Sequence, residues 1–270
     1  MALTFKSKPG LVAYLTCGDP DIATTKAIVL AAIHAGADVI ELGVPFSDPV
    51  ADGPVIQRAS ERALRNKTTL QDVLHLAREV RRQSDAGLIV FSYLNPVLRF
   101  GLGRFCAEAE DAGVDGALIT DLPVEEAASG DYLRLMRSRN LATVFLAAPT
   151  STDERLRRIA EASTGFVYAV SRTGVTGTRK ELPSDARELV ARLRKFTDKP
   201  VAVGFGISTP QQLAAVGEFA EAAVVGSAIV ETIEKSGAQA PSAVAELINR
   251  LRSSSEQQGV SAAGSQPSAT

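Results

Sequence analysis

Two carboxylates, Glu41 and Asp52, have the type and spacing for acid–base chemistry. Glu41 lies within an apolar run, and its neighbours Ile40 and Leu42 would point to the opposite face of a strand. A carboxyl group on an inner face is costly unless it is paired or used, and burial would raise its pKa so that it could donate and accept a proton near neutrality. Asp52 follows eleven residues later in a loop rich in glycine and proline. The alternatives are a core glutamate paired with a base and an aspartate that only makes a turn.

Glycine-rich turns after two later apolar runs predict an anion site. One run ends in residues 204–208, and another ends in Gly226 and Ser227 and leads directly into a helical pattern. Glycine lets backbone N–H groups approach an anion, and the positive end of a helix dipole favours negative charge. We therefore expect Gly206, Gly226 and Ser227 to bind a phosphate group, unless these glycines only form turns.

The segment 171–183 is a long, polar loop with two glycines, placed between an apolar run and a helical pattern. These properties suit a lid that closes over a ligand and excludes water. Gly177 could add an N–H group to the phosphate site, and Thr176 could hydrogen-bond a carboxylate on closure. An ordinary flexible loop is the alternative.

Aromatic side chains gather where the apolar runs end. The chain has only 5% aromatic residues, yet five of them lie at or near such ends: Tyr14, Phe91, Tyr93, Tyr168 and Phe205. Strands favour aromatic residues in any case. Their concentration nevertheless predicts a slot for a flat apolar part of the ligand, beside the phosphate site.

The elements that must position these residues are eight short apolar runs separated by helical patterns. The runs do not alternate between apolar and polar residues, as expected for parallel strands covered on both faces. They span residues 11–15, 37–42, 88–93, 114–119, 142–147, 165–170, 200–204 and 222–225. Eight strand–helix units in about 250 residues predict an α/β fold, a single-domain (β/α)8 TIM barrel with its chemistry in the loops after the strands. A doubly wound open sheet is the alternative.

The barrel is expected to occupy residues 1–252, and the Ser-, Gln- and Ala-rich tail 253–270 is expected to be disordered. The net charge of −2 argues against a nucleic-acid partner. No apolar run is long enough to span a membrane, and the first residues lack the pattern of a signal peptide. Two distant cysteines and two histidines predict neither a disulfide framework nor a metal site, and they fit a reducing cytoplasm.

The chain closely resembles the tryptophan synthase α-chain family, over about residues 10–252. Residues 40–53 look like the signature of that family, and further matching segments are 15–21, 93–96, 121–126, 171–177, 204–208 and 226–230. The resemblance implies cleavage of indole-3-glycerol phosphate to indole and glyceraldehyde 3-phosphate. This is a retro-aldol reaction, and no cofactor is expected in this chain.

The resemblance also implies a role for each candidate residue. Glu41 would protonate C3 of the indole and accept the proton of the glycerol hydroxyl, while Asp52 would stabilise the positive charge that develops on the ring N–H and take its proton. Thr176 would bond to Asp52 when the lid closes. Gly177, Gly206, Gly226 and Ser227 would hold the phosphate. The indole slot would be lined by Tyr14, Phe91, Tyr93, Leu118, Leu146, Tyr168, Val170, Phe205 and Val224.

The implied partner is a tryptophan synthase β chain that uses pyridoxal phosphate, typically in an α2β2 complex that receives the indole. Residues 45–49 and 95–96 would face it. Only about ten residues precede the first strand, and Pro9 and Gly10 interrupt them, so a full plug for the bottom of the barrel is not expected. The alternatives are a stand-alone lyase that releases free indole, an inactive barrel that only activates its partner, and another phosphate-binding barrel. The presence of both Glu41 and Asp52 disfavours the last two.

Overall fold

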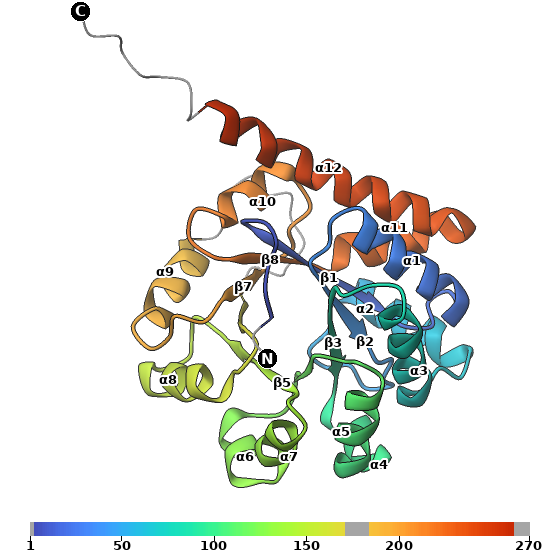
Figure 1. Ribbon diagram of the computed structural model, residues 1–270, viewed down its shortest axis with the longest axis vertical. Coiled ribbons are helices and arrows are strands. Elements are labelled where there is room, and N and C mark those ends of the chain that lie inside the picture. The colour runs from blue at the N-terminus through green and yellow to red at the C-terminus, as the bar shows by residue number, and fades with distance from the viewer. Residues whose placement is uncertain (1–2, 171–183, 262–270) are drawn as a thin grey trace, which may run out of the picture.

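The computed structural model describes residues 3–170 and 184–261, which form a closed barrel of eight parallel strands (Figure 1). Each strand pairs with the next one in the sequence, and β1 closes the ring by pairing with β8. The strands are β1 (Gly10–Thr16), β2 (Val39–Gly43), β3 (Gly87–Ser92), β4 (Gly116–Ile119), β5 (Ala142–Ala147), β6 (Val167–Val170), β7 (Val201–Gly204) and β8 (Ala222–Val225). The predicted (β/α)8 barrel is confirmed, and the open sheet is wrong.

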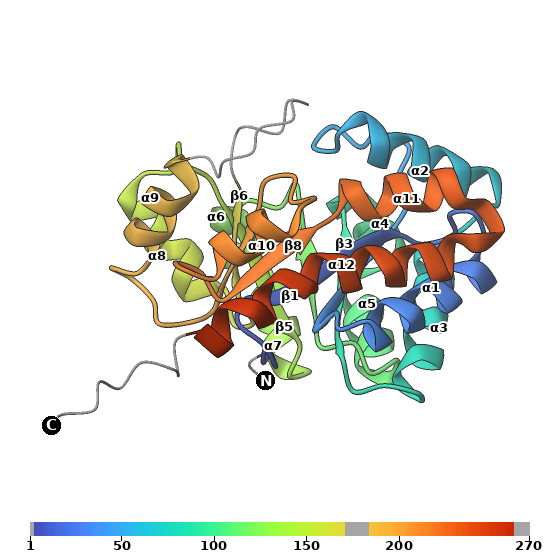
Figure 2. The same cartoon turned by 90° about the horizontal axis from the view of Figure 1, so that it is seen from above.

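Helices surround the ring on its outside, as Figures 1 and 2 show from two directions. They are α1 (Ile22–His34), α2 (Pro54–Arg65), α3 (Leu70–Arg81), α4 (Leu94–Phe100), α5 (Leu102–Asp111), α6 (Val124–Ser129), α7 (Tyr132–Ser138), α8 (Asp153–Ala162), α9 (Ser184–Leu193), α10 (Pro210–Val216), α11 (Ser227–Ser236) and α12 (Ala240–Ser261), with a short 3-10 helix at Gly237–Gln239. Polar caps begin several of them. Thr69, for example, caps α3 in a reciprocal pair with Asp72.

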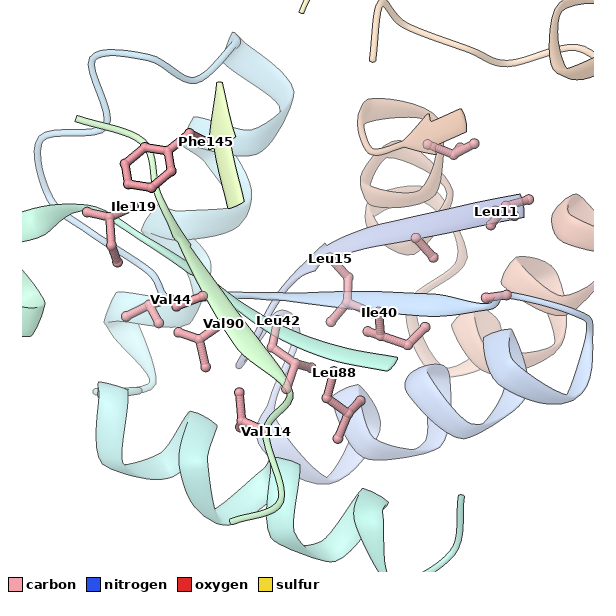
Figure 3. Packing of buried hydrophobic residues seen from close by; sticks show 14 of the residues in the cluster. Leu11, Leu15, Ile40, Leu42, Val44, Leu88, Val90, Val114, Ile119 and Phe145 are labelled. Carbon is pink, nitrogen blue, oxygen red and sulfur yellow. The ribbon is translucent and has the colours of Figure 1, made fainter. Parts of the chain in front are cut away.

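Two apolar layers follow from the alternation of side chains along the strands. Ile40 and Leu42 belong to the large cluster between strands and helices, and Figure 3 shows them with their neighbours on that side of the sheet. Val39 belongs instead to a smaller cluster inside the ring, together with Leu118 and Val224. Positions 39 and 41 on β2 share a face, so the side chain of Glu41 is directed to the inside of the barrel.

The bottom of the barrel is closed by the first residues without a helix. Leu3 is buried in the inner cluster, and the ring of Phe5 lies 6.1 Å from that of Phe166. Leu3 lies against Gly87 and Gly165, near the N-terminal ends of β3 and β6, where an added Cβ atom would meet it at 3.0 and 3.2 Å. As expected from the short N-terminus, no plug helix precedes β1 among the described residues, and the apolar side chains of Leu3 and Phe5 pack into this end instead.

The long helix α12 packs along α1, α10 and α11 and ends at Ser261, beyond the boundary expected after residue 252. Serine, glutamate and glutamine cost little in a helix that is already nucleated, so α12 continues past the boundary that its apolar pattern predicts. Arg252 anchors it by pairing with the buried Asp38 at 2.8 Å. No described helix is long and apolar enough to cross a membrane.

Candidate active site

Glu41 is a buried carboxyl group inside the barrel, with no exposed surface. Neither of its carboxyl oxygens has a hydrogen-bond partner in the part of the chain that the structure describes. Burial raises the pKa of Glu41 to about 8. The side chain is therefore mainly protonated at neutral pH. The prediction that Glu41 faces inward is confirmed, and the alternative of a core glutamate paired with a base has no support among the described residues.

Two tyrosines lie around this carboxyl group. Tyr14 is the register partner of Glu41 on the neighbouring strand, and its ring contacts Phe91 edge-on with centroids 4.9 Å apart. Burial and the charges of Asp52 and Glu41 raise the pKa of both Tyr14 and Tyr168 well above the ordinary value. Glu41 and Asp52 therefore both lie near enough to these two tyrosines to shift their pKa values, as expected if the two carboxyl groups belong to one site.

Glycines at the strand ends make room for these rings. A Cβ atom at Gly43 would lie 2.6 Å from the hydroxyl oxygen of Tyr14, and one at Gly204 would lie 2.5 Å from that of Tyr168. Any larger side chain would displace the tyrosine. This role was not predicted from the sequence, although a glycine at the end of a strand is the signal that could have indicated it.

Asp52 lies in the loop between β2 and α2, half-buried. Burial raises the pKa of Asp52 to about 6, and a hydrogen bond from the Tyr93 hydroxyl opposes part of that rise. The same Tyr93 oxygen accepts a hydrogen bond from the Ala51 N–H group at 3.0 Å. The Tyr93 hydroxyl therefore fixes the Asp52 loop through two hydrogen bonds, one to the Asp52 side chain and one from the Ala51 backbone. From the sequence, Tyr93 was predicted only as part of the apolar wall.

The other predicted wall residues mostly gather inside the ring. Leu118 and Val224 belong to the inner cluster, and Phe91, Leu146 and Tyr168 pack against it. Val170 ends β6 and is half-buried. Phe205 differs, because it packs against the outer cluster between strands and helices. The structure therefore does not group Phe205 with the inner set, since it lies beyond the end of β7, where the strand alternation no longer sets its direction.

The predicted phosphate residues follow the neighbouring strands β7 and β8. Gly206 has φ +83°, a left-handed conformation that favours glycine, and the space where its Cβ would be is open. Gly226 precedes α11 and Ser227 begins it, with no side-chain cap at this helix start. The first N–H groups of α11 remain free of helical partners and suit an anion. Thr176 and Gly177 lie outside the described residues.

A surface groove of about 520 Å³ joins the two segments predicted to face a partner. Pro45 and Phe46 line it from one side, and Asn95 and Pro96 from the other. The large apolar side chains that are exposed among the described residues are Val50, Leu64 and Leu98, which stand in the same loop and in α2 and α4. Of these three, Leu64 lines the groove. Exposed apolar groups near a groove are typical of a protein interface.

Metal-binding residues do not cluster in the described part of the chain, where no group of three or more His, Cys, Asp or Glu side chains could hold an ion. The fold and the site define a (β/α)8-barrel protein that combines two carboxyl groups of raised pKa, an inner apolar cluster, and a glycine turn and a helix start that suit an anion. The family model for the tryptophan synthase alpha chain matches residues 1–259. The chain therefore belongs to the tryptophan synthase alpha chain family.

Known relatives agree with this assignment. The chain is 54% identical over 235 residues to the tryptophan synthase alpha chain of Solibacter usitatus, covering 87% of each chain. It is 46% identical over 251 residues to that of Geobacter sulfurreducens, covering 93% of this chain and 94% of the relative. It also matches a chain of the tryptophan synthase α2β2 complex from the hyperthermophile Pyrococcus furiosus with a TM-score of 0.87 and 41% identity, over 92% of this chain and 99% of the other.

Proposed function

We propose that this chain cleaves indole-3-glycerol phosphate to indole and glyceraldehyde 3-phosphate. The observation that carries the proposal is the Glu41 carboxyl group, which is buried inside the barrel and has no hydrogen-bond partner among the described residues. An uncompensated polar group in such a place is costly, and a substrate that exchanges protons with it accounts for that cost.

Proton transfer at indole C3 is the difficult part of this reaction. The protonated Glu41 carboxyl donates a proton to C3, and the indole ring becomes a cation with its charge at the ring nitrogen. The ionised Asp52 stabilises this charge. The Glu41 carboxylate then accepts the proton of the hydroxyl next to the ring, the carbon–carbon bond breaks, and its electron pair restores the aromatic ring. One proton leaves Glu41 and one returns.

The different pKa values of the two carboxyl groups support these roles. With a pKa of about 8 for Glu41 and about 6 for Asp52, the first is mainly neutral and the second mainly ionised at pH 7. Environments that push two carboxyl pKa values apart assign the acid and the base. The start of α11 has no side-chain cap, and nothing described occupies the space beside the Gly206 backbone. Backbone N–H groups at both places could therefore bind the substrate phosphate.

A tryptophan synthase β chain is the proposed partner, in a cytoplasmic α2β2 complex with pyridoxal phosphate on the β chain. The groove between the 45–49 and 95–96 segments and the exposed Leu98 support this arrangement over a stand-alone lyase. A chain that worked alone would have no need to expose these apolar groups together.

Indole release from indole-3-glycerol phosphate tests the proposal, measured with the purified chain alone and with a cognate β chain added. We expect slow cleavage by the chain alone and a large increase with the β chain. Fast cleavage that the β chain does not change would support the stand-alone lyase. No cleavage in either case would overturn the proposal.

A further inference from the structure

Asp19 is a buried charge that the proposed chemistry does not use. It lies in the loop after β1, in the segment 15–21, and it is only 2% exposed. Arg62 on α2 donates two parallel hydrogen bonds to it, from Nε to Oδ1 and from Nη2 to Oδ2, both at 2.8 Å. The remaining nitrogen of Arg62, Nη1, donates to Glu234 on α11 at 2.7 Å. One guanidinium group thus joins three elements.

The two helices in this network carry opposite ends of the proposed site. α2 begins at Pro54, two residues after Asp52, and Arg62 lies about 12 Å further along it. α11 begins at Ser227 in the phosphate site, and Glu234 lies about 10 Å further along it. Arg62 therefore connects the helix that follows the indole-binding carboxylate with the helix that receives the phosphate.

Apolar packing continues this connection up to the site. Ala59 of α2, Val230 of α11 and Tyr14 form one buried cluster, and Val55 and Phe91 pack against it. The loop after β1 is held to the end of α2 a second time, because the Asn66 side chain donates to the Gly18 carbonyl at 3.1 Å. A shift of α2 relative to α11 would therefore move both the side chains that line the apolar slot and the Asp52 carboxyl group.

The geometry of Arg62 is specific to arginine. A planar guanidinium group can bind a carboxylate with two parallel bonds while it binds a second carboxylate, and a lysine ammonium group cannot reproduce this arrangement. Arg58 provides a natural comparison. It donates to the same Glu234 at 2.7 Å but is half-exposed, and its described hydrogen bonds go only to Glu234 and not to Asp19. Both arginines hold the pKa of Glu234 down to about 2.

We propose that Arg62 is a positioning residue that sets the spacing between Asp52 and the phosphate site at the start of α11. This inference rests on the proposed cleavage of indole-3-glycerol phosphate, whose two ends occupy these places. A changed distance between Asp52 and the phosphate site would misplace only a molecule that binds at both of these places at once. Misplacement of a reacting group by about 1 Å can cost on the order of 100-fold in rate.

The test compares Arg62→Lys with the matched control Arg58→Lys in the full chain, alone and with a β chain. We expect Arg62→Lys to lower kcat for the whole substrate by roughly 10- to 100-fold. The affinities for indole alone and for glycerol 3-phosphate alone should stay within about twofold, because each fragment binds at one end only. Arg58→Lys should match the wild type in all three. The chain contains no tryptophan, so indole fluorescence reports binding directly.

Two results would overturn the inference: an unchanged kcat in Arg62→Lys, or fragment affinities that fall together with kcat, which indicates a general loosening of the fold. If Arg62→Lys does not fold, Asp19→Asn removes the same charge pair with little change in shape and is judged by the same measurements. A wild-type chain without cleavage would contradict the proposed function itself. An active wild type with an equally active variant would contradict only the role of Arg62.

Discussion

At the residue scale, the chemistry depends on how differently the barrel treats two carboxyl groups. Glu41 is fully buried without a described hydrogen-bond partner, whereas Asp52 is half-buried and bonded by the Tyr93 hydroxyl. Desolvation without compensation gives Glu41 the higher pKa of the two. The same sequence segment therefore supplies both an acid and an anion at neutral pH.

The pH dependence of kcat/KM follows from these two values. Cleavage needs ionised Asp52 and protonated Glu41, so kcat/KM should fall below about pH 6, where Asp52 gains a proton, and above about pH 8, where Glu41 loses one. Steady-state rates of indole release across this range provide the measurement. A profile without a basic limb would mean that Glu41 does not act as the acid.

Replacing Tyr93 by phenylalanine should shift the acid limb of this profile. The hydroxyl group lowers the pKa of Asp52, so its removal should raise that pKa and move the acid limb upward by about one pH unit. Tyr132→Phe is the matched control, because Tyr132 is a buried tyrosine whose ring packs on Phe145, away from Asp52. Identical acid limbs in Tyr93→Phe and in the wild type would show that Tyr93 only fills space.

At the element scale, the proposed anion site combines the turn after β7 with the start of α11. Neighbouring parallel strands bring the two loops to the same end of the barrel, and α11 adds its unpaired N–H groups. The sequence predicted this pair of loops from their glycines. It could not predict which way Phe205 turns, because the packing of a residue beyond a strand end depends on the neighbouring helices.

Gly206→Val should weaken phosphate binding. With φ +83° this position is strained for any other residue, so the backbone should turn its N–H group away from the anion. Loss of one hydrogen bond to a charged group, about 1.5–3 kcal/mol, lowers the affinity for glycerol 3-phosphate roughly tenfold or more. Calorimetric titration measures this. Gly103→Val in α5, where added atoms also meet open space but φ is not positive, should leave the affinity unchanged. Equal affinities in both variants would remove the loop from the site.

At the scale of the whole molecule, the groove between the 45–49 and 95–96 segments is the proposed surface for the partner chain. Leu98→Asp places a charge on a 56%-exposed side chain of α4, the helix whose residues Pro96 and Arg99 line the groove. Because an unpaired charge is costly in an interface, we expect this variant to lose most of the stimulation by the β chain, while basal cleavage stays within about twofold of the wild type. Ser138→Asp on the exposed end of α7 is the control. Full stimulation of Leu98→Asp would place the partner elsewhere.

Much of this architecture could be predicted from local pattern. The eight strands and the inward direction of Glu41 follow from apolar runs and the two-residue period of a strand. Long-range contacts could not be predicted in this way. The bond of Tyr93 to Asp52, the closure of the barrel bottom by Leu3 and the pairing of Asp19 with Arg62 each join residues that are far apart in the sequence.

The rate of indole release by Glu41→Gln tests the central claim most directly. Glutamine keeps the size of the side chain but can neither donate the proton to C3 nor accept the hydroxyl proton. We predict that cleavage of indole-3-glycerol phosphate falls by a factor of 100 or more, on the order of a general acid–base contribution, while the affinity for glycerol 3-phosphate and the melting temperature do not fall. Turnover within about tenfold of the wild type would contradict the assignment of Glu41 as the proton carrier.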